Sequence, residues 1–293
     1  MAASSSPDLH GSVIVITGGN SGIGKEAAVA LAGLGATTVI TARNQAKGQA
    51  ALDEIRDRSG SDTAQVMALD LGDFASISAF SAEFHEQFDR LDVLVNNAGA
   101  ILTQRQVTAQ GFETTFGVNH LGHFLLTDLL LDRLQSSAPS RIVNVASFAH
   151  RFALGGMSFA DLQSERGYRS MDVYGKSKLA NVLFTTELAR RLDATGVTAN
   201  CLHPGTVATG FGSVDDTTGI ERVTMMAGRP FFISAERGAR TIVYLASSPE
   251  VEGKTGGYYV RSRLHPASKA GRDAEAARQL WEASEALVAS VPG

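Results

Sequence analysis

Short apolar runs rich in β-branched residues recur along the chain, and longer segments of mixed apolar and polar positions separate them. The first run, Val13 to Ile16, is continuously apolar, which is typical of a strand buried on both faces. Similar patterns predict further strands at residues 38–41, 64–69, 91–95, 141–145, 197–202 and 258–260. Helical patterns lie at about residues 23–34, 45–57, 74–88, 112–134, 173–192 and 235–247. This alternation predicts an α/β fold: a single Rossmann-type doubly wound domain in which helices flank a seven-stranded parallel sheet.

The composition narrows the class of protein further. The chain has 293 residues, of which 30 are glycine and 1 is cysteine, and its net charge is −4. A disordered chain, a collagen or a disulfide scaffold would need very different proportions. A net charge of this sign offers no basic field for nucleic acid or an anionic membrane, so we expect neither as a partner.

The length allows two domains, but no break in composition marks a linker. We expect residues 1–10 to form a flexible tail and residues 11–293 to form one domain, with a substrate lid at about 206–234 and a C-terminal extension. The first residues lack the basic and apolar regions of a signal peptide, and no apolar run is long enough to cross a membrane. We therefore expect a cytoplasmic protein with no membrane span.

A glycine-rich turn, Thr17 to Gly24, joins the first predicted strand to the first predicted helix. Glycine lets the backbone approach a pyrophosphate closely, and a helix N-terminus offers free N–H groups to an anion. The spacing Gly-x3-Gly-x-Gly differs from the commonest dinucleotide fingerprint, and its place between strand and helix makes the signal specific. The turn is predicted to bind a cofactor through Gly18, Asn20, Ser21, Gly22, Ile23 and Gly24.

The residues after the second and third strands indicate which dinucleotide binds. An NAD site usually has an acidic residue after the second strand, to bind the ribose 2′-hydroxyl. Here those positions hold Arg43 and Asn44, and a guanidinium suits a 2′-phosphate, so we expect NADP(H). After the third strand, Asp70 and Leu71 are expected to contact the adenine. Asp70 is alternatively a helix cap, although Asp73 fills that role better.

Tyr174 and Lys178 are four residues apart on a predicted helix and share a face, whereas Lys176 points elsewhere. A tyrosine hydroxyl has an ordinary pKa of about 10, too high for acid–base work near neutral pH. A lysine ammonium at about 4.5 Å is sufficient to lower that pKa by about two to three pH units. Taken alone, this spacing is common by chance.

Further motifs follow in order along the chain: Asn96-Asn97-Ala98-Gly99, then Asn119, Ser147 and Pro204-Gly205. Together with the glycine turn and the Tyr174–Lys178 pair, they make the chain resemble the short-chain dehydrogenase/reductase family, of the classical type, over about residues 11–260. The segments 119–124, 159–163, 177–184, 202–205, 244–251 and 280–281 resemble its retinol dehydrogenase-like branch.

The resemblance implies which residues form the site. The implied catalytic residues are Asn119, Ser147, Tyr174 and Lys178. Besides the residues already named, the implied cofactor-binding residues are Asn97, Ala98, Gly99, Tyr174, Lys178, Pro204, Gly205, Val207 and Thr209.

The resemblance also implies hydride transfer between NADPH and a carbonyl carbon. Tyr174 would give a proton to the carbonyl oxygen on reduction and remove it on oxidation, and Ser147 would hydrogen-bond that oxygen. Lys178 would bind the nicotinamide ribose and lower the pKa of Tyr174, and Asn119 would hold a water that links Lys178 to solvent. His120 and His123 are three residues apart, as metal ligands often are, but no third ligand is evident and we expect no metal.

Apolar side chains within residues 148–170 and 206–234 are expected to line the substrate pocket. In the first segment they are Phe148, Phe152, Leu154 and Met157, together with His150. They favour an apolar, polycyclic or retinoid-like ketone or aldehyde as substrate. The leading hypothesis is a carbonyl reductase or alcohol dehydrogenase; the alternatives are an epimerase or dehydratase with the same Tyr–Lys pair, and a non-catalytic NADPH-sensing protein. The resemblance also implies a homodimer or homotetramer.

Overall fold

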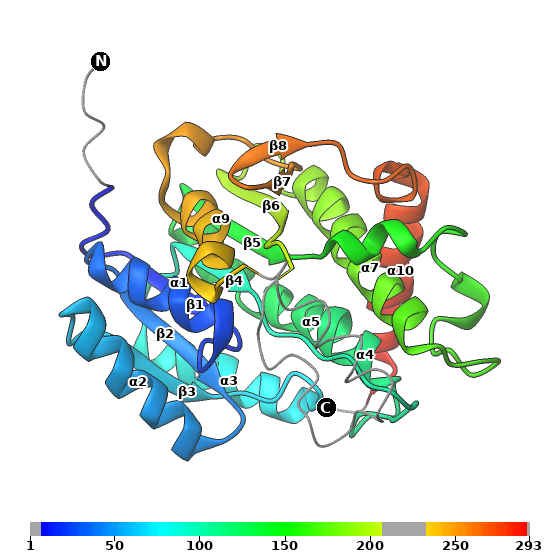
Figure 1. The fold of residues 1–293 in the computed structure, drawn as a ribbon, viewed down its shortest axis with the longest axis horizontal. Coiled ribbons are helices and arrows are strands. Elements are labelled where there is room, and N and C mark those ends of the chain that lie inside the picture. The colour runs from blue at the N-terminus through cyan, green and yellow to red at the C-terminus, as the bar shows by residue number, and fades with distance from the viewer. Residues whose placement is uncertain (1–6, 207–232, 292–293) are drawn as a thin grey trace.

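The computed structural model describes residues 7–206 and 233–291, and one sheet runs through the centre of the molecule (Figure 1). Its strands are β1 (Val13–Ile16), β2 (Thr37–Ala42), β3 (Gln65–Ala68), β4 (Val93–Asn96), β5 (Ser140–Val145), β6 (Val197–His203), β7 (Tyr258–Val260) and β8 (Arg263–His265). Their order across the sheet is β3-β2-β1-β4-β5-β6-β7-β8. Neighbours from β1 to β7 pair in parallel, which confirms the predicted doubly wound α/β fold.

The sheet has one more strand than the sequence predicts, because β8 pairs antiparallel with β7. All three residues of β8 are exposed, so no buried apolar pattern marks the strand. The turn before it contains no glycine, although Arg261 and Ser262 have φ angles of +51° and +59°. The backbone N–H of Ser262 donates to the hydroxyl of Thr241 at 3.1 Å, which holds this strained turn against the neighbouring helix.

The longer helices are α1 (Gly22–Gly33), α2 (Gln45–Ser59), α3 (Phe74–Gln87), α5 (Gly122–Leu129), α7 (Ser170–Arg191), α9 (Ala235–Ser247) and α10 (Ala274–Ala289). All of them except α5 and α10 agree with the predicted helices to within a few residues, and α10 lies in the C-terminal extension, where no helix was predicted. The short ones are α4 (Thr114–Phe116) and α6 (Leu131–Ser136), with 3₁₀ turns η2 (Phe148–Phe152), η3 (Phe159–Asp161), η5 (Pro249–Val251) and η6 (Ala270–Arg272). In the part of the chain that the structure describes, no helix is both long and apolar enough to cross a membrane.

Successive side chains of β1 point to opposite faces of the sheet, and each face has its own hydrophobic core. Val13 and Val15 pack with residues of α3, α5 and α7, whereas Ile14 and Ile16 pack with residues of α1, α2 and α9. Both isoleucines are fully buried, and burial of one such side chain stabilises the fold by about 1.5–3 kcal/mol. The strand order reverses direction between β1 and β4, and in sheets of this type ligands bind at the carboxyl edge beside that point.

The single helix expected at about 112–134 is wrong, because the structure divides this segment into four pieces. Both carboxylate oxygens of the buried Glu113 accept backbone N–H bonds from Thr115 and Phe116, and so begin α4. A π-helical turn, Gly117–Leu121, follows α4 and leads into α5. At Leu130 the backbone leaves helical geometry, and α6 begins there. Turns of the π type are rare and frequently lie at functional sites.

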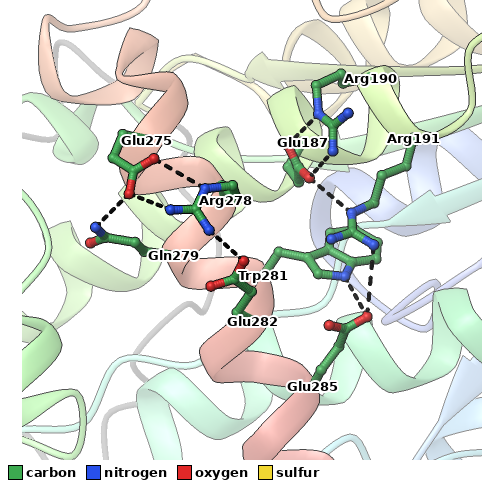
Figure 2. A network of polar contacts seen from close by, with 9 residues as sticks. All are labelled: Glu187, Arg190, Arg191, Glu275, Arg278, Gln279, Trp281, Glu282 and Glu285. Carbon is green, nitrogen blue, oxygen red and sulfur yellow. Dashed lines mark hydrogen bonds and ion pairs between the residues drawn. The ribbon is translucent and has the colours of Figure 1, made fainter.

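The final helix, α10, lies along α7 (Figures 1 and 2). Arg191 of α7 places its guanidinium 4.3 Å from the ring centroid of Trp281. The same guanidinium bonds Glu187 at 2.9 Å and lies 3.8 Å from Glu285. Trp281 in turn packs 4.9 Å from Phe124 of α5. The C-terminal extension is thus a packed helix that covers α5 and α7.

Candidate active site

The glycine turn between β1 and α1 is held by close contacts that exclude larger side chains. Gly18 has a φ of +64°, which favours glycine. A Cβ on Gly24 would lie 2.5 Å from Asn97 Nδ2 and 2.6 Å from Gly18 O. The predicted residues Asn20, Ser21, Gly22 and Ile23 complete this turn at the N-terminus of α1. The turn therefore has the shape that close approach of backbone to a ligand requires.

The N-terminus of α1 is suited to an anion. Ser21, its N-cap residue, makes no side-chain cap bond, and the first turn has no acidic residue. The side chains of Asn44, Asp73, Ser234 and Asp273 cap α2, α3, α9 and α10. The N–H groups of the first turn of α1 thus remain for a ligand, which fits the pyrophosphate of a dinucleotide.

Asn97 supports the glycine turn from the end of β4. Its side chain donates to Thr17 O at 2.8 Å, and its backbone N–H donates to Thr17 Oγ1 at 2.8 Å. Ala98 N–H also donates to Thr17 Oγ1, at 2.9 Å. The predicted segment Asn97 to Gly99 thus lies beside the turn, and the side chain of Asn97 is engaged in holding that turn.

The residues predicted to select and orient the nucleotide lie at the ends of β2 and β3. Arg43 and Asn44 are exposed after β2, and Asn44 uses its side chain to cap α2. Asp70 is partly buried and accepts the backbone N–H of Gly72 at 2.9 Å. The side chain of Leu71 is buried in the core, so it faces away from solvent. Asp73 caps α3 through the N–H of Ala75, which confirms the sequence-based choice of Asp73 as the cap.

Ser147, Tyr174 and Lys178 meet at the carboxyl edge of the sheet. Ser147 follows β5, and its side chain is hydrogen-bonded to the hydroxyl of Tyr174. Lys178 lies one turn further along α7 and donates from Nζ to Val145 O at 3.2 Å, the one hydrogen bond that the described residues give it. Its Nζ is 5.7 Å from the centroid of the Tyr174 ring. The spacing argument for Lys178 is therefore supported, and Lys176 instead pairs with Asp172 on the surface.

Burial dominates the electrostatics of this pair. The protein around the Tyr174 hydroxyl raises its pKa to about 12, because a phenolate there would lose its hydration, while the bond with Ser147 acts in the opposite direction. Burial also lowers the pKa of Lys178 to about 8. In the protein alone the pKa of Tyr174 is therefore raised and not lowered as expected from the neighbouring Lys178, because burial is the largest influence on it.

Asn119 lies in the π turn, and its side chain joins two parts of the site. Its Oδ1 accepts the N–H of Ala100 at 2.6 Å. Its Nδ2 donates to Ala100 O and to Ser177 Oγ, both at 2.9 Å. Ser177 then donates to the backbone oxygen of Tyr174 at 2.8 Å. Asn119 therefore links the loop after β4 to the helix that carries Tyr174.

Three buried or partly buried histidines support the site, and sequence reasoning did not assign them these roles. His123 contacts Thr17 Oγ1 at 2.9 Å. His150, expected to line the pocket, is instead fully buried and donates from Nδ1 to Ser147 O at 2.6 Å. His203 accepts the N–H of Phe148 at 3.1 Å through Nδ1. The only sequence signal was the presence of histidine at the ends of predicted strands and in the helix before the fifth strand.

The last predicted cofactor residues follow β6. Pro204 and Gly205 lie there, and Gly205 has a φ of +96°. The N–H of Gly205 lies 3.4 Å from His203 Nδ1. Val207, Thr209 and most of the expected lid lie outside the described residues. Among the residues that are described, no three His, Cys, Asp or Glu side chains gather as metal ligands would.

Fold and site together define an α/β enzyme with a nucleotide-binding turn and a Ser–Tyr–Lys group at the carboxyl edge of its sheet. The sequence profile described as short chain dehydrogenase matches residues 12–218. The chain belongs to this family, whose members are oxidoreductases that act on CH–OH groups with a nicotinamide dinucleotide. The glycine turn and the uncapped N-terminus of α1 fit such a cofactor.

Curated relatives and solved structures extend this similarity beyond the profile. The chain is 42% identical to retinol dehydrogenase 14 of Homo sapiens, over 96% of this chain and 87% of that protein. It is 44% identical to retinol dehydrogenase 12 of Mus musculus, over 94% and 86% of the two chains. A solved structure of an uncharacterized protein from Mycobacterium paratuberculosis is 34% identical, with a TM-score of 0.77 and coverage of 99% and 97%.

Proposed function

We propose that the protein is an NADPH-dependent carbonyl reductase, and an alcohol dehydrogenase in the reverse direction, with Tyr174 as general acid and base. The observation that carries this proposal is the hydrogen bond between Ser147 and Tyr174, with Lys178 one turn further along α7. Three side chains, one after β5 and two from α7, thus lie at the carboxyl edge of the sheet, two strands from the end of β1, and would give a carbonyl oxygen both a positioning donor and a proton donor.

Each side chain has its own task in the reaction. The bound nicotinamide supplies the hydride on reduction and takes it on oxidation. Ser147 holds the substrate oxygen, and Tyr174 gives it a proton. Lys178 uses one N–H on Val145 O and retains two for ribose hydroxyls. Because the pKa of Tyr174 is about 12, this hydroxyl keeps its proton near neutral pH, which is the form that carbonyl reduction needs.

The preference for NADPH rests on Arg43. This side chain is exposed after β2 and forms no ion pair with a carboxylate among the described residues. A free guanidinium at this position is suited to a 2′-phosphate, which it binds through two parallel N–H bonds.

The proposed substrate is an apolar ketone or aldehyde of retinoid-like or polycyclic shape. Phe148, Phe152 and Leu154 follow Ser147 and are 49%, 56% and 93% exposed. Their exposed surface beside the catalytic hydroxyls would contact an apolar substrate. The relatives named retinol dehydrogenase support the same class.

The test uses the purified full-length chain with a panel of apolar ketones and aldehydes, retinal among them. We expect NADPH absorbance to fall only when a substrate is present, with one alcohol formed per NADPH oxidised, and NADH to serve poorly. An isomerised or dehydrated product without net NADPH loss would instead indicate an epimerase or dehydratase. Binding of NADPH with no turnover of any carbonyl would contradict the reductase proposal.

A further inference from the structure

The helix α10 lies beyond residues 12–218, which match the family profile, and yet it contacts the turn that carries Asn119. Figure 2 shows α10 beside α7, with Trp281 turned towards Arg191. One turn of helix further along α10, Ser284 Oγ lies 2.8 Å from Nε2 of His120, the residue after Asn119. Both side chains are buried, at 0% and 1% exposure. The C-terminal helix is therefore hydrogen-bonded to the π turn.

The donors in this contact can be assigned. Ser284 has one hydroxyl hydrogen, and Oγ donates it to Leu280 O at 2.7 Å. Ser284 must therefore accept a hydrogen bond from Nε2–H of His120. Burial lowers the pKa of His120 to about 3, so the ring is neutral and Nδ1 carries no proton. Nδ1 has no hydrogen-bond partner among the described residues, so Ser284 is the polar contact that orients the ring.

Aromatic side chains enclose the same ring on its other sides. Its centroid lies 5.2 Å from that of Phe116 and 5.8 Å from that of Phe184. Trp281, one turn before Ser284, stacks on Phe184 at 5.8 Å. The ring of His120 is thus packed between side chains of α4, α7 and α10, and dense packing of this kind restricts its rotation.

The opposite side of this turn carries the active-site contacts. Asn119 binds Ala100 through two hydrogen bonds and Ser177 through a third. A π turn does not follow from local propensity, so tertiary contacts must hold it. If His120 moved, Asn119 would lose its register with Ala100 and with the helix that carries Tyr174.

We propose that Ser284 and His120 are positioning residues of the active site: the hydrogen bond from the π turn to α10 fixes Asn119 between the loop after β4 and α7. The expected change in turnover rests on the proposed reductase function. The expected change in the position of Asn119 does not, because it rests only on the contacts of the π turn.

The central variant is Ser284→Ala, measured in the full-length chain by steady-state kinetics and by amide hydrogen exchange. We expect kcat for carbonyl reduction to fall about tenfold, because an unsatisfied buried donor shifts the turn, while KM for NADPH stays within about twofold. We expect the Ala100 amide to exchange about tenfold faster, because its hydrogen bond to Asn119 would be weakened even though Ala100 itself does not contact Ser284.

Two further variants separate positioning from loss of stability. His120→Gln keeps an N–H donor near the place of Nε2 and should retain most of kcat, whereas His120→Leu removes the donor and should behave as Ser284→Ala does. The control is Ala277→Gly, on the same helix and 1% exposed, which destabilises α10 without removing a polar contact. It should lower the melting temperature and leave kcat and the exchange of Ala100 at wild-type values.

The proposal is overturned if Ser284→Ala keeps wild-type kcat and wild-type exchange at Ala100, or if Ala277→Gly changes both as strongly. If the wild-type chain reduces no carbonyl, the proposed function fails, but exchange at Ala100 still tests the link between α10 and Asn119.

Discussion

The hydroxyl of Thr17 lies 2.9 Å from Nε2 of His123, and this contact joins the nucleotide-binding turn to the helix that follows the π turn. His123 donates from Nδ1 to Asn119 O at 3.1 Å, so its Nε2 accepts from Thr17. Burial lowers the pKa of His123 to about 4, which keeps the ring neutral. Thr17 also accepts the N–H groups of Asn97 and Ala98. The hydroxyl of Thr17 thus links three segments of the site by hydrogen bonds: the glycine turn, the segment after β4 and the helix α5.

Removal of this hydroxyl should be costly. In Thr17→Val, two backbone donors and His123 lose their partner inside the protein, and we expect the free energy of unfolding to fall by about 1–3 kcal/mol. The matched control is Thr38→Val on the neighbouring strand β2. Thr38 is also fully buried, but its hydroxyl has no partner among the described residues, so valine should be neutral or stabilising there. Urea unfolding compares the two variants, and equal losses would contradict the assigned role of Thr17.

Gly24→Ala should disrupt the nucleotide-binding turn, because the new Cβ would lie within 2.6 Å of two atoms that hold it. We expect NADPH affinity, measured by fluorescence titration, to fall at least about tenfold through displacement of that backbone. Gly33→Ala is the control on the same helix, since its Cβ would meet nothing closer than 3.9 Å. It should bind NADPH normally and gain up to about 1 kcal/mol in stability. Normal NADPH binding by Gly24→Ala would count against the turn as the pyrophosphate site.

Arg43→Glu should reverse the preference for NADPH. Loss of a charge-assisted bond and addition of a like charge should raise KM for NADPH by about 10- to 100-fold, with little change for NADH. Arg43 is exposed, so the melting temperature should not change. Arg272→Glu, the same charge change at an exposed site in η6, should leave both constants unaltered. An unchanged ratio of NADPH to NADH efficiency in Arg43→Glu would remove the basis for the NADP preference.

The pKa values of Tyr174 and Lys178 predict the pH dependence of carbonyl reduction. Reduction needs a protonated Tyr174 and a charged Lys178, and both forms are present at neutral pH because these pKa values are about 12 and about 8. As pH rises through about 8, Lys178 of the free protein loses its proton, so kcat/KM for reduction should fall above that pH. Lys176→Gln, on the same helix but outside this group, should show the same profile. A kcat/KM that stays constant up to about pH 10 would show that Lys178 does not control the rate.

Apolar periodicity predicted most of this fold, because the sheet is buried on both faces and its strands are therefore apolar runs. The position of the site at the carboxyl edge of the sheet also followed from the sequence, since parallel strands bring their carboxyl ends together. The strand β8 could not be predicted, because its residues are exposed and pair only through the backbone.

The parts of the site that could not be predicted depend on distant partners. His120 meets Ser284 across 164 residues, and His123 meets Thr17 across 106. No local pattern marks such pairs, and the π turn that carries His120 has no hydrophobic period of its own. The raised pKa of Tyr174 was likewise missed, because spacing gives the distance to Lys178 but not the degree of burial.

The variant Tyr174→Phe tests the central claim, because it removes the proposed proton donor and retains the ring. The most direct measurement is a single-turnover reduction of an apolar aldehyde, followed by the loss of NADPH absorbance. We expect the rate to fall by about 10²- to 10⁴-fold, with NADPH binding and melting temperature near those of the wild type. Hydride transfer at the wild-type rate by Tyr174→Phe would contradict the assignment of Tyr174 as the general acid.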